Sequence, residues 1–398
     1  MADITYLTDS DTADEVPDFS LTQGGLTYRF FCWTGLCNNE LGLVHRRVLV
    51  IAAVAWLPLF LLSLFGGHSL FTPFLNDVTA HGRFLIALPA LLAAEAAAHK
   101  MIGPRIKNFI TRKIVAPADI PRFKAAIDAA HIMRNSTILE AGLMILVYTL
   151  GLWVWRSEIA AGTPTWYASP DGTNMNLSLT GYWLVFVSVP IFQFFLVRWY
   201  ARFVIWFVFL LRVSRLDLKL MPTHSDRSAG LGFLGPCLYG FALVLFAQGT
   251  LLSVSIANSA LHAGRNVMDF KLSAVAFILF FVFAALGPLL VFLPGLVKAK
   301  WEALEVYGSL ASHYVAGFDN KWIEGVNPND EPLLGTGDIQ SLADLSNSYA
   351  VLQSMHPVPF DLRDLLWLFG MSAVPLLPLA FFVFSFEELV DKLIQILL

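Results

Sequence analysis

The stretch RFLIALPALLAAEAAAHKMI, residues 83–102, decides the fold class because it is long, continuous and mostly apolar. A helix of about 20 such residues crosses a hydrocarbon core of about 30 Å. Glu95 and His99 interrupt the run four positions apart, so they share one face of the helix. The stretch therefore predicts a membrane-spanning helix that carries a polar site near one end.

Composition extends this prediction to the whole chain. The 398 residues are 57% hydrophobic and only 14% charged, whereas a soluble domain carries about 25% charged residues. Mean hydropathy is +0.64. Seven windows are long and apolar enough to cross a membrane, near residues 47–66, 83–102, 137–156, 180–198, 236–258, 272–297 and 364–385. The sequence predicts an all-α polytopic bundle of about seven spans with a helical cytoplasmic layer.

Basic residues predict the orientation of the bundle. They cluster between the second and third windows and again after the fourth, which places these regions and the N-terminus in the cytoplasm by the positive-inside rule. The side of the C-terminus stays open, because Pro375 and Pro378 could kink the last window. The net charge of -4 argues against a nucleic-acid partner. The three cysteines are too few for a disulfide framework.

The same patterns divide the chain into four parts. The first is an acidic tail, expected to be disordered and uncleaved, and the second is the bundle with two cytoplasmic helical regions. A cytoplasmic helical segment and a last span with a terminal amphipathic helix follow. The expected bounds are 1–25 for the tail, 26–297 for the bundle with cytoplasmic helices at 104–135 and 199–235, 298–363 for the segment and 364–398 for the end.

Ionisable residues at membrane depth form the candidate site, because charge in hydrocarbon is costly and is usually paired or functional. They are expected at one cytoplasmic-side level and comprise Glu95, His99, Glu140, Arg198, Arg202, His224 and Asp226, with Gln248 on a polar stripe of the fifth span. One interpretation is structural: a glutamate pairs with an arginine, Asp226 caps the next helix and His224 bonds to backbone. The same depth also permits a proton or ion relay, or a divalent metal held by Glu95, His99, His224 and Asp226. These alternatives stay open at this point.

The loop PTHSDRSAGLGFLG, residues 222–235, is rich in glycine and precedes a helix, a setting that can bind phosphate. It lacks the Gly-Lys-Ser/Thr ending and the preceding strand of a nucleotide-binding loop. A tight cytoplasmic turn packed against helix ends is the favoured interpretation. The alternative is contact with an anion or lipid headgroup through Arg212, Arg215 and Arg227.

Residues 222–234, with VPLLPL at 374–379 and FEEL at 386–389, resemble a family of uncharacterised bacterial multi-pass membrane proteins with no known activity. Ala229 departs from the pattern, which has glycine there. The resemblance implies a bacterial inner-membrane location and no reaction.

The leading functional hypothesis is a channel- or transporter-like homo-oligomer with a polar cytoplasmic vestibule. Its partners would be membrane lipids and an ion or small solute, and no cofactor is expected. The alternatives are a membrane-embedded metal-dependent hydrolase, which would need a divalent metal, and a non-catalytic scaffold or sensor. Whether the chain is an enzyme is left open.

Overall fold

A computed structural model describes residues 18–37, 43–66, 68–151, 153, 166–171, 174–325 and 336–383. These residues are mainly helical, with one antiparallel pair of short strands that pairs Ala168 with Leu177 and Asp171 with Asn174. The elements are α2 (Gly25–Trp33), α3 (Val44–Phe65), α4 (His68–Leu75), α5 (Val78–His81), η2 (Gly82–Ala87), α6 (Leu88–Ile106), α7 (Asn108–Thr111), η3 (Pro117–Asp119), α8 (Ile120–Arg134), α9 (Thr137–Leu146), η4 (Val147–Gly151), β1 (Ala168–Asp171), β2 (Asn174–Leu177), α11 (Leu179–Trp183), η5 (Leu184–Ser188), α12 (Val189–Val213), η6 (Gly232–Phe241), α13 (Ala242–Ala263), η7 (Val267–Phe270), α14 (Lys271–Leu286), η8 (Gly287–Phe292), α15 (Leu293–Phe318), η9 (Asp319–Ile323), α16 (Asp338–Gln353), α17 (Leu362–Ala373) and η10 (Val374–Phe382).

Six helical segments of the described residues are long and apolar enough to cross a membrane, so the chain is an integral multi-pass membrane protein. They correspond to six of the seven predicted windows and cover Val44–Phe65, Val78–Thr111, Leu179–Val213, Gly232–Ala263, Val267–Ile323 and Leu362–Phe382. The third window, 137–156, contains the shorter apolar helix Thr137–Gly151. At about 1.5 Å per residue this described part is shorter than the hydrocarbon core.

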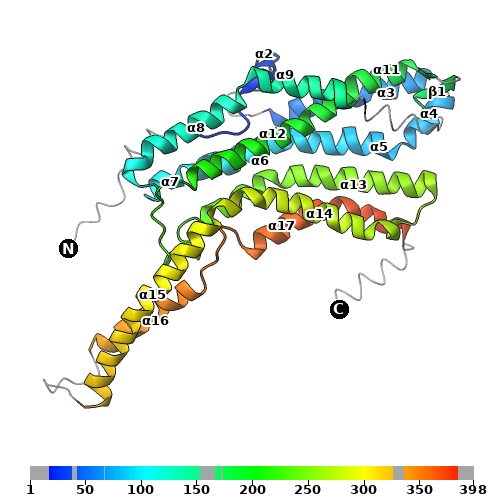
Figure 1. The fold of residues 1–398 in the computed structure, drawn as a ribbon. Helices are drawn as coiled ribbons and strands as arrows, with labels where there is room; N and C mark the ends of the chain where they lie inside the picture. The colour runs from blue at the N-terminus through cyan, green and yellow to red at the C-terminus, as the bar shows by residue number, and fades with distance from the viewer. Residues whose placement is uncertain are drawn as a thin grey trace.

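The spans lie side by side and the connections gather at two ends (Figure 1). One end carries α7, the start of α8 and the loop that follows α12, and we call it the basic end. The opposite end carries α4 and the β1–β2 hairpin. Helix α13 lies at the centre of the packing, because it contacts α6 on one side and α17 on the other.

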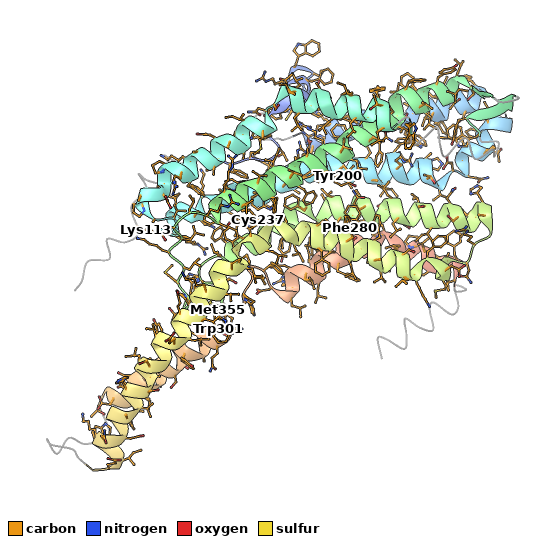
Figure 2. The ribbon with its side chains drawn as sticks, in the orientation of Figure 1. Lys113, Tyr200, Cys237, Phe280, Trp301 and Met355 are labelled. Atoms are coloured by element: carbon orange, nitrogen blue, oxygen red, sulfur yellow. The ribbon has the colours of Figure 1, made fainter. Side chains whose placement is uncertain are left out.

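Helices α15 and α16 form an arm that projects away from the bundle at the basic end (Figure 1). At its base Lys300 of α15 ties the two helices together, because its Nζ donates to the carbonyl oxygens of Gln353, the last residue of α16, at 3.0 Å and of Met355 at 2.7 Å. Figure 2 shows Trp301 and Met355 near this base. Met355 is buried, whereas the Trp301 side chain is 67% exposed.

The chain segment before α2 is packed rather than loose. Residues 18–25 were expected to belong to the disordered tail, but Phe19 and Leu21 are each 2% exposed. The Phe19 ring stacks on Phe209 of α12 with 4.4 Å between ring centroids. Burial of these apolar side chains holds the segment against α6 and α12, so the segment packs on the bundle despite the acidic run at positions 3–18. Residues 1–17, the loop at 326–335 and the expected terminal helix in 384–398 lie outside the described residues.

Candidate functional site

The centre of the site is the Glu95 carboxylate on α6, which meets three arginines in the interior. Oε1 accepts from Arg202 Nη2 at 2.8 Å and from Arg198 Nη1 at 3.1 Å. Oε2 lies 3.5 Å from Arg47 Nη2. Glu95 is 2% exposed, and Arg47 is fully buried. Burying these charges costs desolvation free energy that their mutual attraction offsets, so removal of one partner would leave an uncompensated buried charge.

Helical spacing explains how the arginines converge. Arg198 and Arg202 are four residues apart on α12, so their side chains leave the same face. Arg47 belongs to a buried stripe of α3 that repeats every fourth residue and consists of Arg47, Ile51, Ala55, Leu59 and Ser63. Aromatic rings share the burial, since the guanidinium of Arg202 lies 4.9 Å from the Trp199 ring centroid.

A second carboxylate, Glu140, extends the cluster to α9. It lies in the first turn of that helix, after Ser136, whose Oγ accepts from the Leu139 N–H at 3.2 Å. Its Oε1 is 3.2 Å from Arg198 Nη2. Its Oε2 accepts from the backbone N–H and the hydroxyl of Thr27, at 3.0 and 3.2 Å. The ion cluster therefore consists of Glu95, Glu140, Arg47, Arg198 and Arg202.

The segment before α2 closes the cluster from one side. The Thr22 hydroxyl donates to the Glu95 carbonyl oxygen at 3.0 Å, and Arg198 Nη2 lies 3.4 Å from the Gly24 carbonyl oxygen. Gly25 has φ +85°, and a Cβ there would lie 2.3 Å from Glu140 Oε1. Glycine is thus required at this position by both backbone conformation and space.

Charge balance is the unusual property of the ion cluster. Three guanidinium groups face two carboxylates, which leaves one excess positive charge in a set of residues that are each at most 6% exposed. Arg134 lies beside it and donates through Nη1 to the Ser20 carbonyl oxygen at 2.5 Å. Burial, with a further contribution from Arg198, lowers the pKa of Arg134 to about 10. The cluster is therefore cation-rich and almost entirely buried.

The other residues expected in the cluster lie elsewhere. His99 contacts Ser20, with 3.1 Å between its Nδ1 and the hydroxyl. Gln248 donates to the Tyr200 hydroxyl at 2.8 Å, within the bundle (Figure 2). His224 and Asp226 lie in the loop at the basic end.

Asp226 organises the loop 222–235. Its carboxylate accepts the backbone N–H groups of Ser228, Gly230 and Gly232 at 2.9, 3.1 and 2.9 Å. Burial acts to raise its pKa, but these hydrogen bonds outweigh burial and lower it. Gly232 begins η6, so Asp226 stabilises the start of the next helix, as the structural interpretation predicted.

The four proposed metal ligands do not meet. Glu95 contacts arginines, His99 contacts Ser20, and His224 Nδ1 lies 3.0 Å from Asp226 Oδ1. Among the described residues no group of three or more His, Cys, Asp and Glu side chains is placed to hold a metal ion. The geometry therefore joins only His224 and Asp226 of that set.

Alanine at position 229, where the resembling family has glycine, adopts an unfavourable backbone conformation. Its φ is +53°, in the left-handed region that favours glycine, and Arg227 beside it has φ +54°. Ala229 is fully buried. Arg212 and Arg215 are exposed at the end of α12, and their expected lipid contact stays a prediction.

Sequence patterns alone did not point to Arg47, Thr27 or the segment before α2. Arg46 and Arg47 stand at the start of the first window, where a pair of basic residues is typical of the flank of a span. The sequence feature that could have shown the burial of Arg47 is its place at the start of the α3 stripe, which repeats every fourth residue and continues with Ile51, Ala55, Leu59 and Ser63. No comparable signal exists for Thr27, which reaches Glu140 through a contact between residues 113 positions apart.

A large pocket adjoins the ion cluster at Glu140. Its volume is about 850 Å³, and it lies between α2, α3, α9 and α12. Its wall is almost entirely apolar, and the polar residues among the described lining are Thr27, Thr34, Glu140 and Tyr148. The apolar lining comprises Leu26, Phe30, Phe31, Leu36, Val50, Ile51, Val54, Ala141, Met144, Pro190, Ile191, Phe194 and Phe195.

Comparison of the chain with known protein families, with curated proteins and with solved structures found no match. The two motifs that resemble a bacterial membrane-protein family therefore carry no family assignment.

Proposed function

We propose that the protein is a transporter-like membrane protein that takes an uncharged, lipid-like molecule into the pocket between α2, α3, α9 and α12. The observation that carries the proposal is the pairing of an apolar pocket of about 850 Å³ with one charged residue, Glu140, among the described residues of its wall, at the edge of the ion cluster. Sites for small molecules have this character: a mostly apolar wall, a few placed polar groups and a volume of about 300–1,000 Å³.

The wall supports a ligand that comes from the membrane. Val50 and Val54 of α3 are 44% and 43% exposed although they line the pocket. Both belong to a membrane-spanning helix, so the surface outside them is hydrocarbon rather than water. A chain-like apolar molecule could enter sideways without crossing water.

The electrostatics support an uncharged polar end that donates hydrogen bonds. A negative group would lie beside the Glu140 carboxylate, and a positive group would approach a cluster that already holds one excess positive charge. Hydroxyl or amide groups avoid both costs and can donate to carboxylate or threonine oxygens. The arginines themselves are already committed to carboxylates, since Arg198 contacts both Glu95 and Glu140.

A matched series of glycolipids tests the ligand class. Glucosyl, glucuronosyl and glucosaminyl diacylglycerols share their chains and differ in charge, and each would compete with a photoreactive glucosyl lipid for the purified protein in lipid nanodiscs. The neutral lipid is expected to bind at least tenfold more tightly than either charged one. Equal binding of the three, or preference for a charged lipid, would overturn the ligand class.

The pocket itself is tested by two neighbouring positions on α9. Met144 lines the pocket, whereas Ile145 does not and is 64% exposed. Met144→Trp should fill the pocket and abolish labelling, and the control Ile145→Trp should label like the native chain. If both variants label normally, the molecule does not bind here.

Transport is a separate step. A sugar headgroup crosses hydrocarbon slowly because its hydroxyls lose their hydrogen bonds. Proteoliposomes with the neutral glycolipid in one leaflet should therefore exchange it faster with the native chain than with Met144→Trp.

A scaffold or sensor is the second candidate, and the arm favours it. The arm projects beyond the bundle and exposes large apolar side chains such as Trp301, Val306 and Leu310. Binding without lipid exchange in the proteoliposomes would select this function over transport. Assembly into a homo-oligomer, a cytoplasmic N-terminus and a bacterial inner-membrane location remain proposals that light scattering and accessibility labelling can test.

A further inference from the structure

A polar pocket of about 730 Å³ lies where the loop 222–235 meets the start of α17. An apolar pocket of about 910 Å³ lies along α17 and α13. Tyr239, Leu362 and Arg363 line both, so the two pockets adjoin. Together they form an amphipathic groove, which we call the α17 groove, distinct from the pocket at Glu140.

The apolar half of the α17 groove faces outward on a span. Leu366 and Trp367 are 59% and 52% exposed, and both belong to the segment Leu362–Phe382, which is long and apolar enough to cross a membrane. Their surroundings are therefore acyl chains. The polar half is at the basic end, next to the base of the arm, where headgroups lie.

Cations in the polar half are available to a ligand. Arg227 and Arg363 line it, are exposed, and form no ion pair with another described residue. Two guanidinium groups on one pocket suit a phosphate, which accepts several charge-assisted hydrogen bonds.

The carboxylates of the same pocket differ in their hydrogen-bond partners and in their exposure. Asp226 accepts three backbone N–H groups, and Asp364 accepts from the Tyr239 hydroxyl at 2.6 Å and from the Asp361 N–H at 3.0 Å. Asp361 is the N-cap of α17: its side chain accepts from the Asp364 backbone N–H, and its Oδ1 lies 3.2 Å from His356 Nδ1. The Asp361 side chain is nevertheless 64% exposed, so this carboxylate at the rim is accessible to a positively charged group.

We infer that the α17 groove binds a phospholipid with a phosphoethanolamine headgroup. The phosphate lies between Arg227 and Arg363, the ammonium group faces Asp361, and one acyl chain follows Leu366 and Trp367. Two available guanidinium groups and one available carboxylate match a headgroup that carries both charges. A purely anionic headgroup would satisfy the arginines and leave Asp361 facing negative charge.

Native mass spectrometry of the full chain tests this assignment with phosphatidylethanolamine and phosphatidylglycerol of identical chains. The double variant Arg227→Gln/Arg363→Gln should weaken binding of both lipids at least tenfold. Asp361→Asn should weaken phosphatidylethanolamine alone, at least threefold, while asparagine still serves as an N-cap of α17. The matched control Arg265→Gln removes an exposed arginine outside the groove and should bind like the native chain.

The following results overturn the inference. Unchanged affinity in the double variant, with a native melting temperature, removes the phosphate site. An equal effect of Asp361→Asn on both lipids, or preference of the native chain for phosphatidylglycerol, removes the assigned headgroup. Soluble glycerophosphoethanolamine, which lacks chains, should bind at least a hundredfold more weakly than the lipid, and equal binding would show that the apolar half contributes nothing.

Discussion

Replacing Glu95 with glutamine is the sharpest perturbation of the ion cluster. The change preserves size but removes the charge that lies 2.8, 3.1 and 3.5 Å from the three arginines. It raises the excess positive charge from one to two in a buried environment. Breaking a buried ion pair by removing one partner costs about 3–5 kcal/mol. We expect Glu95→Gln to fall in this range.

The assay is thermal unfolding of the detergent-purified chain at a fixed scan rate. At about 2.1 cal/mol/K per residue the unfolding entropy is about 0.8 kcal/mol/K, so the expected loss lowers the melting temperature by about 4–6 °C. The control is Glu302→Gln, which removes an exposed partner 3.7 Å from Lys298. A surface pair is worth about 0–1 kcal/mol, so the control should shift by about 1 °C or less.

A double variant separates charge imbalance from lost packing. Glu95→Gln with Arg202→Gln returns the excess to one positive charge, so its destabilisation should be clearly less than the sum of the two single changes. Additive effects, or a Glu95→Gln chain that melts within 1 °C of the native one, would refute the view that the cluster is a coupled ionic unit.

Three further predictions concern groups outside the spans. Burial, assisted by Arg134, lowers the pKa of His131, so this side chain stays neutral in the folded chain while the unfolded chain takes up a proton. The stability of the native chain should therefore fall as pH drops below about 6.5. Melting curves at pH 7 and pH 5 should show a smaller fall for His131→Gln. The lowered pKa of Asp226 means that its carboxylate stabilises the fold above the unfolded pKa of about 3.9, and this stabilisation is lost as pH falls through the lower folded value. Asp226→Asn should therefore cost about 1.5–3 kcal/mol at pH 7 and nearly as much at pH 4, and the difference from the native chain should shrink only below about pH 3.9 by the same melts. Ala229→Gly should raise stability by up to about 1 kcal/mol, because it relieves a left-handed alanine at φ +53°, and a lower melting temperature would contradict this.

Much of the bundle follows from the sequence because hydrocarbon imposes simple requirements. Apolar length predicted seven spans, and six of them are long apolar helices, whereas the window at 137–156 contains the shorter apolar helix Thr137–Gly151. The cost of unpaired charge predicted that Glu95 or Glu140 would meet an arginine, and both contact Arg198. Local chemistry also predicted that Asp226 would support the next helix.

The rest of the site depends on how each helix is rotated about its axis and on contacts between residues far apart in the sequence. A shared depth in the membrane does not state which helix faces meet, so His224 and Asp226 were grouped with Glu95 although the loop packs beside the start of α17. Residues 18–25 follow an acidic stretch, yet Phe19 stacks on Phe209 and holds them against α12. Composition does not reveal this contact. The hydrogen bond from Thr27 to Glu140 joins residues 113 positions apart, so composition does not reveal it either.

Mapping the photoreactive glucosyl lipid on the native chain tests the central claim most directly. With the reactive group on the acyl chain, peptide sequencing should find the label on wall residues of the pocket, such as Phe30, Val54 and Phe194, and unlabelled neutral glycolipid should suppress it. A label confined to residues outside the wall, such as Leu49 and Ile145, and insensitive to competitor would contradict the proposed site.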